Sequence, residues 1–184
     1  QAVDTLTMLL KAQVPHHFCE DRGTQVLLER AGIAATVLPL PLEAPKEIAP
    51  LPEKARFLVD IEREYKDFFD SIMRSAPDLE FAKFEGAKNV EEFTGLIRFL
   101  HDRSVDMPVK QALMSGRYVV SNIQAPHCGF VSDTQNIEAM RAEVIRKIRH
   151  YQVQKEPNLA AANYFAANCS PDSFKAKLEH LTSI

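Results

Sequence analysis

The sequence predicts an α/β fold of the Rossmann-like, doubly wound type: a mainly parallel sheet with helices on both faces and a helical C-terminal tail. Short apolar segments rich in β-branched and aromatic residues alternate with segments of helical period. The stretch QALMSGRYVVSN, residues 111–122, shows one such unit. Its helix-forming residues end at Gly116, where the chain must leave the helix, and an apolar strand follows at once.

Length and charge limit the class of protein. The 184 residues suffice for one full core, so we expect a single Rossmann-like domain over residues 1–184. With 25 acidic and 22 basic residues the net charge is −3, which gives no overall attraction to nucleic acid or to an anionic membrane. Cys19, Cys128 and Cys169 form no CxxC pair, which favours reduced thiols in a cytoplasmic protein. No apolar run is long enough to span a bilayer.

The first 54 residues contain two predicted strands and one helix. Apolar strands are predicted at 14–19 and 35–40, and a helix between them at 21–31 ends at Gly32. Proline lacks an amide N–H and is excluded from helix interiors and central strands. Five prolines between residues 39 and 52 therefore predict an ordered crossing loop at 41–54.

From residue 55 onward, strands and helices alternate regularly. Predicted strands lie at 56–61 (RFLVDI), 79–84, 96–101 (LIRFLH), 118–122 and 130–131. Predicted helices lie at 64–75, at 90–94 as at most one short turn, and at 108–115. The first of these helices places Tyr65, Phe68, Phe69 and Ile72 on one face, which we expect to be part of the core.

The C-terminal third is predicted to be helical. Ser132 or Asp133 is expected to cap a long helix whose apolar stripe consists of Ile137, Met140, Val144, Ile148 and Tyr151. A helical tail at 158–184 follows, with helices at 158–168 and 173–181 separated by Pro171.

Polar residues follow the predicted strands at their carboxyl ends, where an open parallel sheet binds its ligands. Ser121 and Asn122 end one strand, although each could simply begin a loop. Arg103 follows another strand and could reach a phosphate. Asp106 and Lys110 lie at the start of a short helix, whose N-terminal amides favour an anion.

Two cations follow the strand at 56–61. An arginine fork and a lysine point charge both neutralise phosphate oxygens, so Arg63 and Lys66 are candidates for binding an anion. The alternative is a solvated helix start, in which Glu62 and Glu64 compensate these charges.

Two further pairs of loop residues allow a structural and a functional interpretation. Glu85 and Gly86 follow a strand, where glycine permits close approach of a ligand, but a plain turn explains them equally well. His127 and Cys128 make a poor metal site because no second ligand pair has zinc spacing. A nucleophilic Cys128 would need an activated thiolate.

The order of the elements resembles the carboxyl-terminal, donor-binding lobe of GT-B glycosyltransferases. The resemblance covers nearly the whole chain and depends on the order of its segments rather than on any single motif. These segments are ERAGIAATVLPLPL (29–42), ARFLVDIEREYKDFFDSIMRSAP (55–77), LEFAKFEG (79–86), LIRFLH (96–101) and KQALMSGRYVVSN (110–122).

The resemblance implies binding of a nucleoside-diphosphate sugar for polysaccharide or glycoconjugate synthesis, with no other cofactor and no metal. The residues implied for the diphosphate are Arg63, Lys66, Arg103 and Lys110. Those implied for the nucleotide and sugar are Glu85, Gly86, Asp106, Gln111, Ser121, Asn122 and His127. Catalytic residues remain unassigned.

The resemblance also implies a partner, the N-terminal acceptor-binding lobe of the same parent chain. An isolated lobe would bind its donor weakly and turn over little or nothing. We expect an apolar surface at the first strand or the tail, left by the missing lobe. The parent could associate peripherally with the cytoplasmic face of a membrane.

The departures from the family pattern favour an alternative function. Gln111 and Arg103 stand where retaining members carry two glutamates, and DIEREYK lacks the usual glycine-rich turn. A non-catalytic relative that binds a nucleotide, a glycan or a partner protein therefore stays open. An unrelated flavodoxin-like module is a third possibility, disfavoured by the missing acidic cluster at the first strand end and by the proline-rich crossing.

Overall fold

The computed structural model describes residues 17–20, 22–84, 90–101, 107–134 and 136–182. The chain divides into two compact units, residues 1–42 with 168–184, and residues 43–167. Residues 38–55, which include the proline-rich segment, contain neither helix nor strand. None of the described helices is long and apolar enough to cross a membrane.

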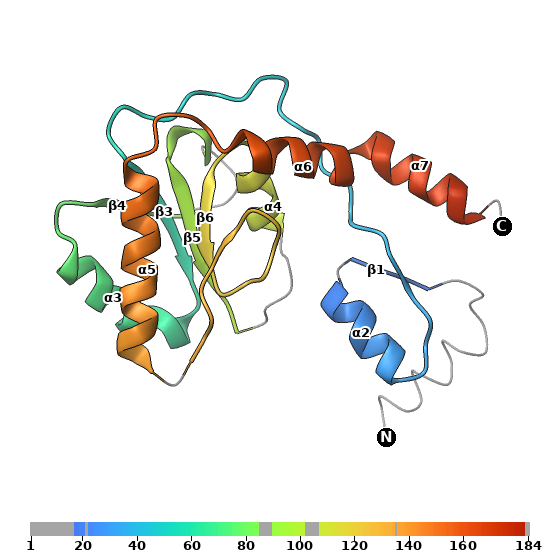
Figure 1. Cartoon of the computed structure of the whole chain (residues 1–184), viewed down its shortest axis with the longest axis horizontal. Helices are drawn as coiled ribbons and strands as arrows, with labels where there is room; N and C mark the ends of the chain where they lie inside the picture. The colour runs from blue at the N-terminus through green and yellow to red at the C-terminus, as the bar shows by residue number, and fades with distance from the viewer. Residues whose placement is uncertain (1–16, 21, 85–89, 102–106, 135, 183–184) are drawn as a thin grey trace. The chain divides into compact units, whose positions relative to one another are not determined.

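The described residues of the smaller unit form a parallel pair of short strands and two helices. Its elements are β1 (Phe18–Cys19), α2 (Arg22–Arg30), β2 (Thr36–Val37) and α7 (Pro171–Thr182) (Figure 1). Phe18 pairs with Thr36 and Cys19 with Val37. The predicted strand at 35–40 is wrong in length, since Pro39 and the following prolines cannot donate to a ladder. Residues 14–16 of the first predicted strand lie outside the described residues.

The larger unit is built on a parallel sheet, in which the described strands follow the order β4-β3-β5-β6-β7 (Figure 1). These strands are β3 (Arg56–Ile61), β4 (Glu80–Lys83), β5 (Gly95–Phe99), β6 (Tyr118–Ser121) and β7 (Gly129–Phe130). Every neighbouring pair is parallel. The predicted Rossmann-like α/β fold is thereby confirmed.

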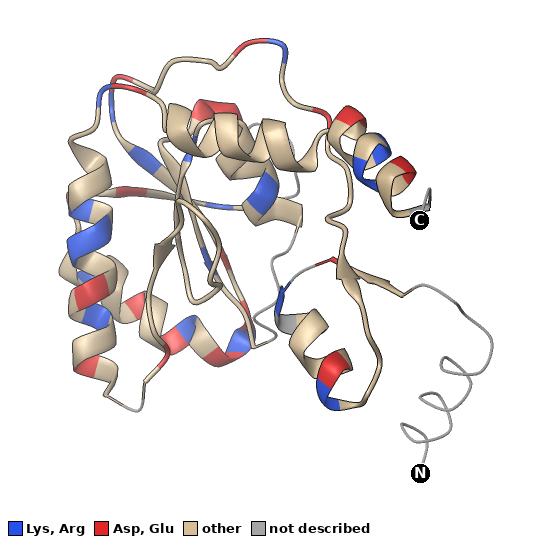
Figure 2. Cartoon of the chain, turned by 45° about the vertical axis from the view of Figure 1, so that its right-hand side comes forward, with Lys and Arg blue, Asp and Glu red and all other residues tan. Residues whose placement is uncertain are grey.

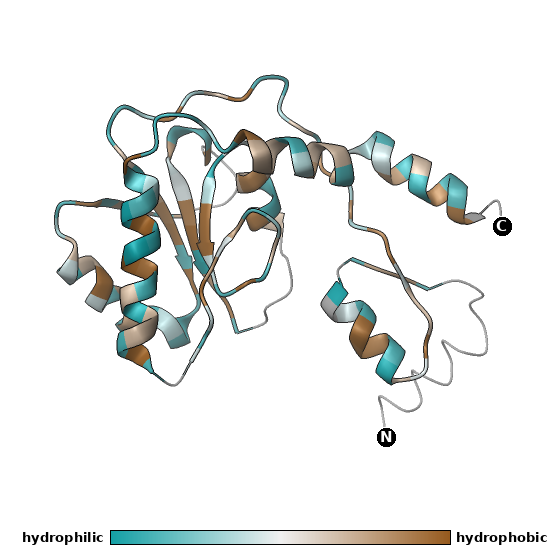
Figure 3. Cartoon of the chain, viewed as in Figure 1, coloured by the Kyte–Doolittle hydropathy of each residue, from teal (hydrophilic) through white to brown (hydrophobic). Residues whose placement is uncertain are grey.

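Helices cover both faces of this sheet. On one face α3 (Lys66–Ser75) and α5 (Ile137–Gln152) pack against each other, and on the other α4 (Met107–Met114) packs on β5 and β6. Phe57 and Ile97 face the α3 and α5 side, where they join Phe69 and Ile72 in the main apolar cluster. The apolar strands of the sheet are visible in Figure 3.

Two short helical segments lie in the described part of the larger unit, η1 (Arg63–Tyr65) before α3 and η2 (Val90–Glu92) before β5. The helix α6 (Leu159–Cys169) begins in this unit, and its last two residues belong to the smaller unit. Gly116 has a φ of 71°, as predicted for the end of the helix before β6. At Gly95 an added Cβ would lie 2.3 Å from the Tyr118 carbonyl oxygen, so only glycine permits this close approach of β5 and β6.

The start of α5 differs from the prediction. Neither Ser132 nor Asp133 caps the helix, because the cap is Asn136, whose side chain accepts the Ala139 N–H at 3.0 Å. Ile137 at the first turn is 51% exposed, while Met140, Val144 and Ile148 are buried as predicted.

The solvent side of α5 alternates acidic and basic residues, visible as coloured bands in Figure 2. Glu143 pairs with Arg146 at 2.7 Å, and Arg149 at the last turn pairs with Asp78. These exposed pairs contribute little to the stability of the fold.

Candidate ligand-binding site

The strand order identifies the topological switch point of the larger unit's sheet. From β3 the chain passes to β4 on one side, and β5, β6 and β7 then extend the sheet on the other side. The winding direction therefore reverses between β3 and β5. Open α/β sheets bind ligands outside the carboxyl ends of the strands at such a switch point. We refer to this place, formed by the chain that follows Ile61 and Phe99, as the switch-point edge.

A helical N-terminus lies at the switch-point edge. Glu62 directly follows β3, and its N–H donates to the Phe99 carbonyl oxygen at 3.0 Å. Its backbone is extended and it occupies the N-cap position of η1, yet its side chain caps none of the helical amides. Such free amides at the start of a helical segment attract anions.

Arg63 and Lys66 both lie on this first helical stretch, and both side chains are exposed. Within the described part of the chain, neither cation forms an ion pair with an acidic side chain. Glu64 and Asp67 are exposed beside them. The direct pairing expected for a self-compensating helix start is thus not formed among these residues, and both cations can contact an external anion.

Two polar contacts connect β3 with β5 at the switch-point edge. Arg98 forms an ion pair with Asp60, its partner in the strand register, so the charge of each is compensated. One residue beyond the end of β3, the Glu62 carboxylate accepts the backbone N–H of His101. Glu62 therefore places a carboxylate across the switch point.

The carboxyl end of β6 is closed by internal hydrogen bonds. The Ser121 hydroxyl donates to the Arg98 carbonyl oxygen at 2.5 Å and accepts the Ile123 N–H at 3.0 Å. Asn122 is 1% exposed. Its side-chain amide donates to the Leu100 carbonyl oxygen at 2.6 Å, and its oxygen accepts the Leu100 N–H at 3.0 Å. Asn122 thus extends the ladder between β5 and β6 with its side chain.

A tyrosine connects this closed end to the start of α3. The Asn122 amide donates to the Tyr65 hydroxyl at 3.2 Å, and that hydroxyl donates to the Asp133 carboxylate at 2.6 Å. The ring centroids of Tyr65 and Phe99 lie 5.7 Å apart. These polar groups hold loops together, and Ser121 and Asn122 present no free side-chain group to a ligand.

Lys110 and Gln111 on α4 occupy different environments. Lys110 is 2% exposed and engaged in an interaction within the protein. Gln111 lines a cavity of about 530 Å³ with Ser115. The other lining residues precede β3 or β5, in the segments 43–46 and 90–92. This cavity therefore lies toward the amino ends of the strands, and the structure does not bring Gln111 to the switch-point edge.

His127 also lies away from the switch-point edge. Since β7 runs parallel to β6, with Gly129 opposite Val120, the intervening loop must turn back along β6. His127 occupies this turn with a left-handed φ of 59°, and its ring lies 5.5 Å from that of Tyr164 on α6. Its assignment as a contact of the sugar stays a prediction.

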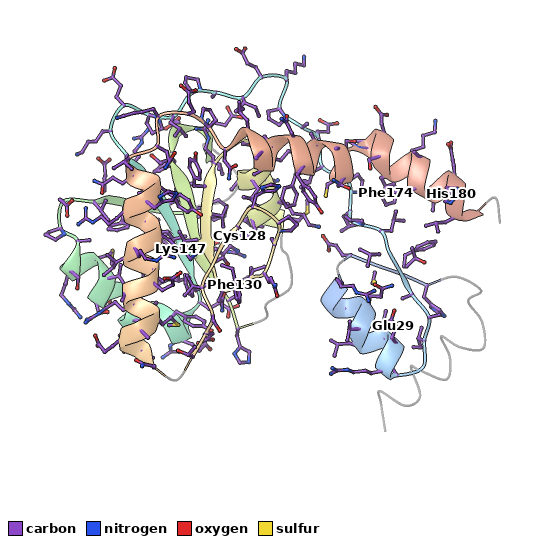
Figure 4. The ribbon with its side chains drawn as sticks, in the orientation of Figure 1. Glu29, Cys128, Phe130, Lys147, Phe174 and His180 are labelled. Atoms are coloured by element: carbon purple, nitrogen blue, oxygen red, sulfur yellow. The ribbon has the colours of Figure 1, made fainter. Side chains whose placement is uncertain are left out.

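Cys128 has the properties of a structural thiol. Burial raises its pKa to about 12, although the nearby Lys147 charge opposes that shift (Figure 4). Its Sγ lies 3.7 Å from the Val119 carbonyl oxygen. A protonated, buried thiol is a poor nucleophile.

The remaining predicted residues, Glu85, Gly86, Arg103 and Asp106, lie outside the described residues. Among the residues that the structure does describe, no group of three or more His, Cys, Asp or Glu side chains could hold a metal ion. The contacts of Glu62 and of Tyr65 were missed by sequence reasoning. The position of Glu62 at a strand end was a signal, but its backbone partner lies 39 residues away.

Comparisons with known proteins add the fold relationship. No family model and no curated protein matches the sequence. A solved GtfA/B complex superposes with a TM-score of 0.66 at 13% identity, over 98% of this chain and 47% of the other. A mutant of S. aureus TarM, bound to fondaparinux, alpha-GlcNAc-glycerol and UDP, superposes with a TM-score of 0.62 at 11% identity. This superposition covers 98% of this chain and 46% of the TarM chain.

The pneumococcal O-GlcNAc transferase GtfA, in complex with UDP and GlcNAc, gives a TM-score of 0.61 at 10% identity, over 90% of this chain and 44% of the other. The chain has the fold of a lobe of a GT-B glycosyltransferase. At these identities the likeness concerns the fold alone. The chain spans less than half the length of each of these structures.

Proposed function

We propose that the larger unit, residues 43–167, is the carboxyl-terminal donor-binding lobe of a glycosyltransferase. In this proposal the switch-point edge binds the diphosphate of a nucleotide sugar through Arg63 and Lys66. The observation that carries the proposal is the position of these two exposed cations, without ion-pair partners among the described residues, beside uncapped helical amides at the topological switch point.

This arrangement suits the chemistry of glycosyl transfer. Negative charge develops on the leaving nucleoside diphosphate as the bond to the sugar breaks, and donors that are already in place lower the barrier. The planar guanidinium of Arg63 can bind two phosphate oxygens at once, while the Lys66 ammonium supplies a point charge. Arg103 is proposed to assist at the diphosphate, and Glu85, Gly86 and Asp106 are proposed for the nucleoside and sugar. Lys110, Gln111 and His127 are left out of this proposal, because Lys110 is buried and the other two lie away from the switch-point edge.

The smaller unit is proposed to belong to a second, acceptor-binding lobe. A parallel pair of two-residue strands is too small a sheet to be stable alone. Large apolar side chains are exposed on this unit, namely Phe18 (40%), Leu27 (65%) and Leu40 (51%). Covering them with the rest of a lobe would complete the sheet, and the solved structures of this fold are about twice as long. The chain alone would then bind donor weakly and transfer no sugar.

Calorimetric titration of UDP, GDP, CDP and ADP into the 184-residue chain tests donor binding. UDP is the first choice because it is present in the TarM and pneumococcal GtfA structures. One nucleotide should bind selectively, and Arg63→Ala or Lys66→Ala should each weaken it about fivefold, as expected for an exposed charge-assisted contact of about 1 kcal/mol.

Arg74→Ala is the matched control, since Arg74 is also an exposed cation of α3 but lies in its last turn. The Arg74→Ala variant should bind the nucleotide with the same affinity as the wild type. Equal losses in all three variants would indicate a general charge effect and would contradict the assignment of Arg63 and Lys66.

A second candidate is a non-catalytic GT-B-like domain that binds a nucleotide or a partner protein. The observation that favours it is Glu62, whose carboxylate accepts the His101 N–H at the switch-point edge. Gln111, at the position of a family glutamate, can hydrogen-bond but cannot act as a carboxylate. Absence of nucleotide binding at millimolar concentration would favour a partner-binding domain over a donor lobe.

A further inference from the structure

Glu62 combines two features that the proposed donor site does not require. It occupies the N-cap position of η1, where an acidic side chain would ordinarily accept an amide of its own helix. Its side chain makes no such contact, and instead accepts the backbone N–H of His101 beyond the end of β5. The carboxylate therefore bridges the two strands between which the winding reverses.

The N–H of His101 is a donor of the kind that an incoming anion would use. Backbone amides at strand ends and helix starts bind phosphate because they supply positive partial charge without a side chain. At the switch-point edge there are two such groups, the uncapped amides at the start of η1 and the N–H of His101. The first group is free of side-chain caps, whereas the second is occupied by Glu62.

Charged side chains surround the contact between Glu62 and the His101 N–H. Arg98 on β5 forms an ion pair with Asp60 on β3, its partner in the strand register. Arg63 and Lys66 supply positive charge on the adjoining helical turn. A phosphate that approaches the His101 N–H meets the Glu62 carboxylate that this N–H already contacts, and like charges repel.

We infer that Glu62 is a built-in competitor for the anion at the switch-point edge, an autoinhibitory contact that must open before a diphosphate can use the His101 amide. The inference rests on the proposed function in assigning a diphosphate to this edge. In this inference the Glu62 carboxylate and a phosphate oxygen compete for the same N–H, so release of Glu62 and binding of the anion are coupled.

Two variants test this inference. Glu62→Gln removes the charge but keeps an oxygen that can accept the His101 N–H, and Glu62→Gly frees that amide altogether. Glu64→Gln is the matched control, because Glu64 is an exposed carboxylate on the same helical turn. UDP and inorganic pyrophosphate are titrated into all three variants and the wild type by calorimetry. The amide resonance of His101 is followed by NMR in parallel, and thermal unfolding verifies that each variant is folded.

Both Glu62 variants should bind pyrophosphate and UDP about tenfold more tightly than the wild type, whereas Glu64→Gln should change the affinity by less than about twofold. The His101 resonance should shift on titration of Glu62→Gly at lower ligand concentration than in the wild type.

The possible failures are distinguishable. If the wild type binds UDP and neither Glu62 variant binds it more tightly, the inference is overturned and the donor site stands. Equal gains in Glu62→Gln and Glu64→Gln would reduce the effect to net charge and also overturn it. Pyrophosphate binding that improves without any UDP binding supports the inference and contradicts the donor function. Absence of binding by every variant overturns both.

Discussion

The carboxyl ends of β6 and β3 in the same sheet differ in how their polar residues are used. At the end of β6, Ser121 and Asn122 are buried, and their side chains bind the backbone of β5 and of the following loop. At the end of β3, Arg63 and Lys66 are exposed, and neither has an ion-pair partner among the described residues. Both ends carry polar residues, but only one can offer them to a ligand.

The difference shows why small polar residues are weak indicators of a site. Ser and Asn have short side chains that readily replace a missing backbone partner, so a strand end is a natural structural position for them. Exposed cations at a helical N-terminus have no comparable structural use. We therefore expect substitutions at the closed end to lower stability and substitutions at the open end to lower ligand affinity.

The largest effect on stability is expected for Asn122→Ala. The substitution leaves both backbone groups of Leu100 without their side-chain partner and removes one of the hydrogen bonds of the Tyr65 hydroxyl, at a cost of about 2–4 kcal/mol in the free energy of unfolding. Chemical denaturation measures it. Asn163→Ala, at an exposed position of α6, is the control and should change stability by less than about 0.5 kcal/mol. A neutral Asn122→Ala would contradict the closed character of this strand end.

Ser121→Ala should cost about 1–2 kcal/mol, because the hydroxyl that serves the Arg98 carbonyl and the Ile123 N–H is buried. The same denaturation measurement applies. Ser132→Ala removes an exposed hydroxyl and serves as the control. An equal loss of stability in Ser121→Ala and Ser132→Ala would show that burial of the Ser121 hydroxyl does not determine its contribution.

Tyr65→Phe should lower stability by about 1 kcal/mol, since it keeps the ring on Phe99 but removes the hydroxyl between Asn122 and Asp133. In a double-mutant cycle with Asp133→Ala, the two losses should be less than additive because the residues share one hydrogen bond. Full additivity would indicate that the contact contributes nothing in solution.

The open end should tolerate substitution. The double variant Arg63→Ala with Lys66→Ala should unfold within about 0.5 kcal/mol of the wild type, because neither side chain is buried. A loss of more than about 1 kcal/mol would show that these cations have a structural role and would weaken their assignment to an anion.

The smallest effect is expected at an exposed ion pair remote from both strand ends. The hydrogen bond from Arg149 lowers the pKa of Asp78 from its ordinary 3.8 to about 2. Because the folded-state pKa is depressed, the small stabilisation is present above pH 3.8 and is lost as the pH falls toward 2. NMR titration should show the Asp78 pKa returning toward 3.8 in Arg149→Ala. An unchanged value would mean that the pair does not form in solution.

Much of the fold could be predicted because it depends on short-range patterns. The strand at 56–61 was predicted with the same bounds as β3, and the helix at 158–168 lies within one residue of α6. The spacing of apolar residues decides which face of a strand or helix is buried, and this spacing is visible in a short stretch of sequence. The strands of the smaller unit were less predictable, since the prolines after Val37 end the ladder.

The candidate site likewise combines features that the sequence predicts with features that only the tertiary structure shows. The sequence by itself determined that cations follow β3 and that Gly116 ends a helix before a buried strand, because these are properties of adjacent residues. Only the tertiary structure decided that Asn122 binds Leu100 and that Glu62 binds His101. These partners lie 22 and 39 residues apart, and the sheet order and register that bring them together depend on packing over the whole larger unit.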